Sequence, residues 1–141
     1  MKKVVLDTNI LLASLGKQSP YRPIFQALKD GKFLLVVSND ILSEYAEKAE
    51  EETSATVSRN LMEFLMVLPN VMHQDVYYHW WLVPDDPDDN KFTDCYVAAG
   101  AEILVSEDRA FRQIDPDGFP PVYVMRMKAF MDWLDSQPDG F

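Results

Sequence analysis

The chain has 141 residues, of which 23 are acidic and 13 basic, so its formal net charge is −10 at pH 7. That length suits a single domain, residues 1–141, which can bury about 68–70% of the surface of the unfolded chain. The acidic excess argues against a broad electrostatic grip on nucleic acid, which needs clustered Lys and Arg, but net charge does not describe an individual cleft.

The cysteine content and the hydropathy of the chain indicate its cellular compartment. Cys95 is the single cysteine, which excludes an internal disulfide, and the sequence shows no secretory leader. No uninterrupted apolar stretch approaches the ~20 residues that a bilayer crossing needs. We therefore expect a reduced cytoplasmic protein that does not enter a membrane.

Four short runs in the chain are rich in Val, Ile and Leu and do not alternate with polar residues, namely residues 3–7, 33–38, 102–106 and 122–125. This pattern is typical of parallel strands that are buried on both faces. A weaker candidate at 70–74 follows Pro69 and is expected to be an edge strand or simple extended chain. The runs predict a central, mainly parallel sheet.

Segments with helical spacing of apolar residues separate these runs, at 22–30, 39–50, 54–67, 91–100, 108–113 and 127–136. Ser38 directly precedes the second of them and is a candidate N-cap. The loop at 83–92 has two prolines and four aspartates, which predicts a connection rather than a helix or strand. The alternation predicts an α/β fold, a three-layer α/β/α sandwich whose ligand site lies beyond the carboxyl ends of the strands.

Three acidic residues fall at or just beyond a predicted strand end: Asp7, Glu44 and Asp108. All three should face one rim of the sheet. Glu44 and Asp108 also have ordinary interpretations, as a solvated helix residue and as a helix-start residue favoured by the macrodipole. Asp7 is the strongest candidate, because the end of an apolar run is a costly place for an unpaired carboxylate.

A fourth acid, Asp94, lies in the apolar segment 92–101 and is expected in the first turn of a buried helix. A buried carboxylate must be neutralised, hydrogen-bonded or matched with a cation. Lys91, three residues earlier, is the alternative partner. Asp94 is thus either part of the acidic site or half of a local ion pair.

Four converging carboxylates would raise one another's pKa unless a cation were present. Oxygen ligands without a His or Cys cluster favour Mg²⁺ or Mn²⁺ over zinc. We assign no role to His73 or His79, and we expect Cys95 to be a small core residue. The usual chemistry of such a site is hydrolysis of phosphate esters.

Several stretches in this order resemble the PIN-domain (PilT N-terminus) nucleases, particularly the toxins of VapC-like toxin-antitoxin pairs. They are "VVLDTNILLAS" (4–14), "SNDILSEY" (38–45), "DDNKFTDCYVAAGAEILVSEDRAF" (88–111) and "VYVM" (122–125). The resemblance covers nearly the full chain. It implies a Mg²⁺- or Mn²⁺-dependent endoribonuclease that acts on RNA, is often a homodimer, and is inhibited by an antitoxin protein.

The resemblance also assigns roles to individual residues. It implies that Asp7 and Asp94 hold the principal metal, that Glu44 positions or deprotonates the attacking water, and that Asp108 completes the catalytic set of four metal-site acids. Accessory positions matched by the resemblance are Asn9, Asp89 and Ser106, of which Asn9 and Ser106 orient carboxylates or line the site.

Two other functions are alternatives to a nuclease. A PIN-fold module that holds a protein partner with weak catalysis is the main alternative, and the intact set of acids argues against it. A phosphatase with an aspartyl nucleophile would need a second aspartate two residues after Asp7, where Asn9 stands.

Two further groups of residues are candidate contacts. Arg109 and Arg112 either contact phosphates or are solvated helix residues. The aromatic stretch 76–83 is a candidate dimer or antitoxin surface, although we expect at least half of its Tyr and Trp side chains to pack in the core.

Overall fold

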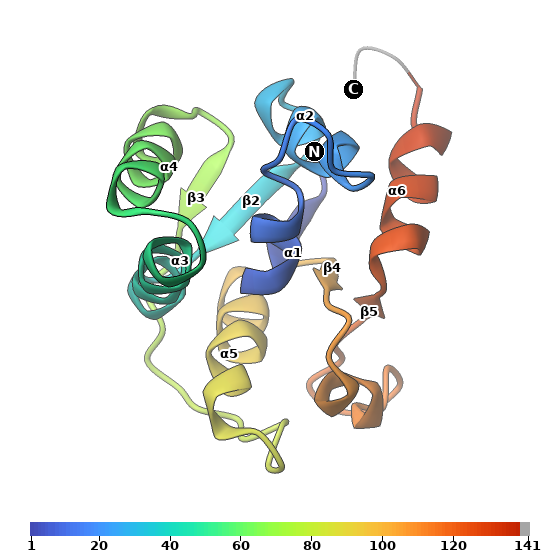
Figure 1. Ribbon diagram of the computed structural model, residues 1–141. Helices are drawn as coiled ribbons and strands as arrows, with labels where there is room; N and C mark the ends of the chain where they lie inside the picture. Colours follow the sequence, from blue (N-terminus) through green and yellow to red (C-terminus); the bar gives the residue numbers. More distant parts are fainter. Residues whose placement is uncertain (139–141) are drawn as a thin grey trace.

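The computed structural model describes residues 1–138, which form a five-stranded sheet in the order β3-β2-β1-β4-β5 with helices around it (Figure 1). All four strand pairs are parallel. The strands are β1 (Lys3–Leu6), β2 (Leu34–Val37), β3 (Val71–His73), β4 (Ile103–Val105) and β5 (Val124–Met125). The predicted α/β class with a parallel central sheet is confirmed, and the weak candidate at 70–74 is an edge strand paired with β2.

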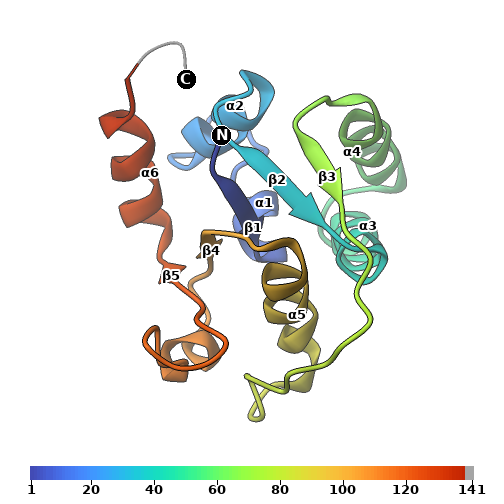
Figure 2. The ribbon, with the colours of Figure 1, turned by 180° about the vertical axis from the view of Figure 1, so that it is seen from behind.

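The helices are α1 (Thr8–Ala13), α2 (Arg22–Lys29), α3 (Asn39–Glu52), α4 (Ala55–Val67), α5 (Asn90–Ala99) and α6 (Met127–Ser136), with 3-10 turns η1 (Pro87–Asp89) and η2 (Arg109–Gln113). Seen from the two sides, α1 and α5 cover opposite faces of the central strands (Figure 2). None of these helices combines the length and the apolar character that a bilayer crossing requires.

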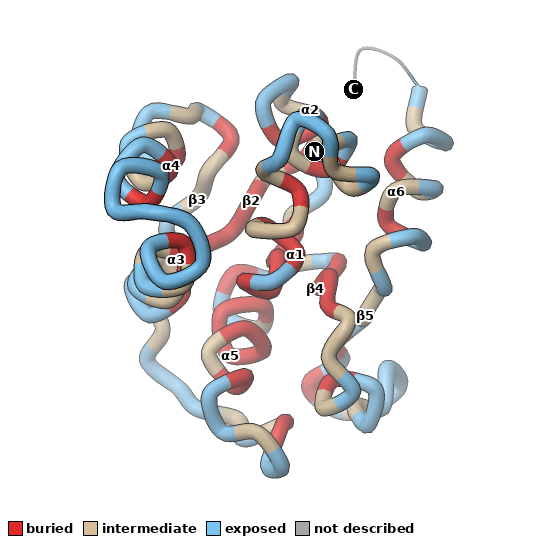
Figure 3. Tube along the Cα trace, in the orientation of Figure 1, coloured by how far each residue is buried: buried red, intermediate tan, exposed pale blue. Residues whose placement is uncertain are grey.

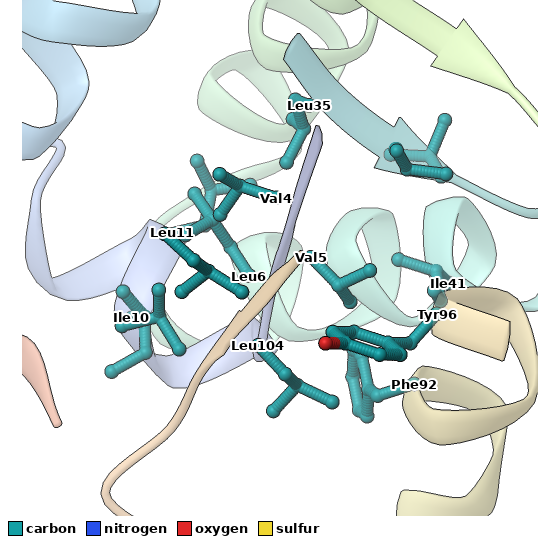
Figure 4. Close-up of a cluster of buried hydrophobic side chains, with 14 of the residues drawn as sticks. Val4, Val5, Leu6, Ile10, Leu11, Leu35, Ile41, Phe92, Tyr96 and Leu104 are labelled. Carbon is teal, nitrogen blue, oxygen red and sulfur yellow. The ribbon is translucent and has the colours of Figure 1, made fainter. Parts of the chain in front are cut away.

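The central strand shows why the first apolar run is not alternating. Val4, Val5 and Leu6 of β1 are all completely buried. Val5 points to the side of Phe92 and Tyr96, whereas Leu6 points to the side of α1 (Figure 4). Because both faces of the strand are covered, every position in it favours an apolar side chain.

Burial is concentrated in β1, β2, β4 and α5, while the outer faces of α3 and α4 are exposed (Figure 3). The predicted cap of α3 is confirmed, since Ser38 Oγ accepts a hydrogen bond from the Ile41 amide at 3.2 Å. These elements fix the edge of the sheet from which the candidate site is built.

The structure differs from the sequence-based expectation in three segments. Helix α1 begins one residue after Asp7, and no helix was predicted there. The segment after Asp108 is a 3-10 turn, and the loop at 83–92 contains the short turn η1. Such one-turn elements are set by tertiary contacts rather than by apolar periodicity, so the sequence pattern did not indicate them.

Candidate metal centre

Asp7 stands at the carboxyl end of β1, where the pairing of Leu6 with Val105 in β4 places Asp7 beside Ser106. The Asp7 amide donates to the Val105 carbonyl at 3.0 Å, and Ser106 Oγ donates to Asp7 Oδ2 at 2.7 Å. Asp7 and Ser106 are both buried. The register of two central strands therefore holds the first carboxylate in place.

Asp108 reaches the same edge through Ser106. The Asp108 amide donates to Ser106 Oγ at 3.0 Å, and Asp108 Oδ1 accepts from the Ala110 amide at 3.0 Å, which caps η2. Ser106 thus connects Asp7 with Asp108.

Asp89 and Asp86 come from the loop before α5. One carboxylate oxygen from each of Asp86, Asp89 and Asp108 lies within 4.8 Å of the others. Asn90 fixes this loop, because its buried side chain exchanges hydrogen bonds with the amide and carbonyl of Val83, both at 3.0 Å, and donates to the Pro87 carbonyl at 3.2 Å. A rigid loop therefore carries two aspartates to Asp108.

The electrostatics of this edge favour a bound cation. Among the residues that the structure describes, Asp89 Oδ2 is the one buried side-chain oxygen or nitrogen atom without a hydrogen-bond partner. Burial, contact with the Asp108 carboxyl and the charges of Asp7, Asp108 and Asp86 raise the pKa of Asp89 to about 9.

The pKa of Asp7 is also raised, but less than that of Asp89. Burial raises the pKa of Asp7 to about 6, against the lowering effect of the Ser106 hydrogen bond, and the charges of Glu44 and Asp108 raise it further. Several carboxylates at one edge, one with an orphan oxygen, are a donor set that fits a hard divalent cation such as Mg²⁺ or Mn²⁺.

Glu44 approaches the same edge from α3. The buried Tyr45 hydroxyl donates to the Leu6 carbonyl at 2.6 Å and so attaches α3 to the end of β1. Glu44 Oε1 accepts from Lys91 Nζ at 2.9 Å, and Glu44 Oε2 accepts from the Thr8 hydroxyl. Lys91 therefore pairs with Glu44, not with Asp94 as the local alternative had it.

Asp94 is buried as predicted, but it lies in the second turn of α5 rather than the first. Its Oδ2 contacts His79 Nδ1 at 2.9 Å, and its Oδ1 accepts from the Trp80 amide at 2.9 Å. Both oxygens thus bind the segment that leads from β3 to η1. The structure brings Asp7, Glu44, Asp89 and Asp108 to one edge and gives Asp94 these two partners instead.

The remaining predicted residues are placed as follows. Asn9 lies on α1 with an exposed side chain. Tyr77, Tyr78 and Trp81 are 88%, 64% and 64% exposed, so the expectation that at least half of the aromatic side chains of 76–83 pack in the core was wrong. This segment lacks regular secondary structure and packs on the core through Val76, Leu82 and Val83, which leaves these three aromatic side chains exposed.

Sequence reasoning missed Asp86 and the pairing of Lys91 with Glu44. The available signal was the density of aspartates in 83–92, which marked the loop as acidic without indicating which carboxylates turn inward. Asp89 immediately precedes α5, where the helix dipole favours a negative charge, and its side chain makes no capping bond. Its carboxylate is therefore free to face the other acids.

Comparisons with known proteins agree with this architecture. A family model for the PIN domain matches residues 3–110. A DNA-bound VapBC structure from Salmonella typhimurium is 18% identical with a TM-score of 0.61, covering 90% of this chain and 99% of its own. VapBC2 from Rickettsia felis, bound to a DNA fragment from its promoter, is 15% identical with a TM-score of 0.60, covering 88% and 98%.

The PIN domain of human SMG5 is also similar, with 14% identity and a TM-score of 0.54, covering 93% of this chain and 97% of its own. At these identities the likeness to solved structures concerns the fold alone. No curated protein matches the sequence significantly.

Proposed function

The chain belongs to the PIN-domain family, and from this premise we propose that it is a Mg²⁺- or Mn²⁺-dependent endoribonuclease, the toxin of a toxin-antitoxin pair. The observation that carries the proposal is the acidic edge, where the buried Asp89 has an oxygen without a partner and lies against Asp108 and Asp86. In a protein without catalytic function, loss of one of these mutually repelling carboxylates would raise the stability of the fold.

The proposed metal ligands are Asp7, Asp89 and Asp108, with Asp86 at the outer side of the cluster. Asp89 thus has the metal-ligand role that the family resemblance implied for Asp94. Both carboxylate oxygens of Asp94 are hydrogen-bonded to His79 and Trp80. When bound, the metal supplies a Lewis acid that offsets the charge of the transition state and lowers the pKa of an attacking water.

The chain's own residues have distinct tasks in this proposal. Ser106 orients Asp7 and Asp108 through its two hydrogen bonds. Glu44 is held by Lys91 and Thr8, and its carboxylate accepts a proton from the attacking water. Lys91 supplies a positive charge at the acidic edge, where the phosphate of the substrate would bind.

We further propose a cytoplasmic homodimer that is controlled by an antitoxin. The two similar VapBC structures are DNA-bound complexes, which supports the expectation of a protein partner for this chain. In this chain, the exposed Tyr77, Tyr78 and Trp81 are the candidate contact surface. Light scattering at high protein concentration tests the dimer, and a monomer would contradict that part of the proposal.

The central test compares Asp7→Asn and Asp89→Asn with Asp132→Asn, a matched loss of one carboxylate on the exposed face of α6. Cleavage of a structured RNA in Mg²⁺ or Mn²⁺ should be lost in the first two variants and kept in the third. Full activity of Asp7→Asn, in preparations free of contaminating nuclease, would overturn the proposal. If calorimetry detects no Mn²⁺ binding at millimolar metal, that result would favour the alternative function, a protein-binding module.

A further inference from the structure

A groove beside the acidic edge is lined by residues of η2, of the segment that follows it and of β5. Its volume is about 380 Å³, and the polar residues in its lining are Ser106, Arg112, Tyr123 and Arg126. Its floor includes the buried Phe111 and Val122. The groove is large enough for a nucleotide-sized group and has an apolar base with charged edges.

Ser106 connects the groove with the candidate metal centre. Its side chain donates to Asp7 and accepts from the Asp108 amide, and the same residue lines the groove. Ser106 thus places the groove directly beside the acids.

The charge of the groove contrasts with that of the chain. Within residues 1–138, Arg112 makes no ion pair, and Arg126 Nε donates to Glu107 Oε2 at 2.7 Å. A second cleft, near the start of α5, is lined by three aspartates, Asp40, Asp88 and Asp94, together with Lys91. The arginine-lined groove, by contrast, has Arg112 and Arg126 and no acidic residue in its lining, which is the charge that a polynucleotide backbone needs.

Tyr123 adds a surface for a base. Tyr123 is 52% exposed and lines the groove together with Arg112 and Arg126. An exposed aromatic ring next to arginines is the arrangement on which unpaired bases stack, whereas the bases of a duplex are already stacked on one another.

We propose that this groove binds one unpaired nucleotide next to the cleaved bond, with Arg112 on its phosphate and Tyr123 stacked on its base. The inference rests on the proposed nuclease function and adds Arg112 and Tyr123 to it as substrate-binding residues outside the metal centre. Arg126 remains paired with Glu107 and borders the phosphate path.

The test measures RNA binding in the Asp7→Asn background, so that cleavage does not consume the ligand. Fluorescence anisotropy with a single-stranded RNA and a duplex of equal length compares Arg112→Gln, Tyr123→Ala and Tyr123→Phe with Arg59→Gln. Arg59 lies on the exposed side of α4 and is the matched loss of one positive charge. Thermal melting confirms that each variant is folded.

We expect Arg112→Gln to weaken single-strand binding about 5-fold to 10-fold and to reduce the salt slope by about 0.7, the value for one phosphate contact. Tyr123→Ala should weaken it by at least about 5-fold, the low end for loss of a stacked base. Tyr123→Phe should bind as the parent does, and neither Tyr123 variant should affect the duplex.

Binding of Arg112→Gln and Tyr123→Ala at the level of Arg59→Gln would overturn the inference. If the wild-type chain still cleaves RNA and Asp7→Asn does not, the nuclease function stands without the groove. If the wild-type chain cleaves no RNA and Asp7→Asn binds none, both proposals fall together. Equal loss of duplex and single-strand binding would also overturn the stacking of an unpaired base.

Discussion

Asp89 and Asp94 lie five residues apart at the start of α5, and both carboxylates are buried, yet their surroundings are opposite. Asp94 has a hydrogen-bond partner for each oxygen, a histidine ring and a backbone amide. Asp89 has an oxygen without a partner and faces other carboxylates.

The difference teaches that burial of a carboxylate does not by itself identify a metal ligand. A buried charge whose hydrogen bonds are satisfied inside the protein holds the fold together. A buried charge surrounded by like charges lowers the stability of the metal-free protein, and it is tolerated where a cation is bound. The partners, rather than the burial, separate the two aspartates.

The largest expected effect is on activity. Asp89→Asn should reduce RNA cleavage about 10²-fold to 10³-fold, the loss typical when one charge-stabilising group is removed from a site. Asp94→Asn should keep at least about one-tenth of the activity of the folded protein, because the amide can still accept from the Trp80 amide. Single-turnover cleavage rates decide this, and the reverse order would restore Asp94 as the ligand.

The next effect concerns stability, for which we expect the Asp94 substitution to matter more than the Asp89 substitution. Asp94→Ala removes two hydrogen bonds and leaves the Trp80 amide without its acceptor, so it should lower the free energy of unfolding by about 2–3 kcal/mol. Without metal, Asp89→Asn should cause no loss and even a gain, because it removes a repelled carboxylate. Urea unfolding in chelator measures both, and a larger loss for Asp89→Asn would contradict the comparison.

The third effect is a pH dependence of the metal-free protein. The pKa values of Asp7 and Asp89 are raised on folding to about 6 and about 9, so above pH 4 the folded chain binds more protons than the unfolded chain. Stability should therefore fall as the pH rises from 5 to 9. Thermal melting in chelator should show this fall, with a flatter profile above pH 6 in Asp89→Asn.

Mg²⁺ provides the control for the pH experiment. Because the cation binds the ionised carboxylates, added Mg²⁺ should raise the melting temperature more at pH 8 than at pH 5. The Asp132→Asn variant should follow the wild-type profile in both conditions. Melting temperatures that rise with pH in chelator would show that these carboxyls are not destabilised by burial.

The smallest effect concerns the histidine partner of Asp94. The His79 side chain is 62% exposed, so His79→Gln should lower the free energy of unfolding by less than about 1 kcal/mol. Activity should be unchanged within a factor of two or so. Urea midpoints at pH 7.5 test whether Asp94 is held mainly by the Trp80 amide, and a loss as large as that of Asp94→Ala would assign the hold to His79.

Most of the fold could be predicted because its signals are local. Runs such as 33–38 and 102–106 are apolar throughout, which indicates strands covered on both faces, and the carboxyl ends of parallel strands meet at one edge. Asp7 and Ser106 are adjacent for this reason, since each follows a central strand. Helix α1 was not predicted because its six residues are too short for a periodic pattern.

The loop 83–92 marks where this reasoning stops. Sequence by itself determined the parallel sheet, the edge that carries the site and the presence of acids there, because strand burial and strand direction follow from the order of apolar runs. Only the tertiary structure decided that Asp86 and Asp89 turn toward Asp108 while Asp94 turns toward His79. The direction of a loop carboxylate depends on the packing around Asn90 and η1, which brings together residues that no fixed spacing relates.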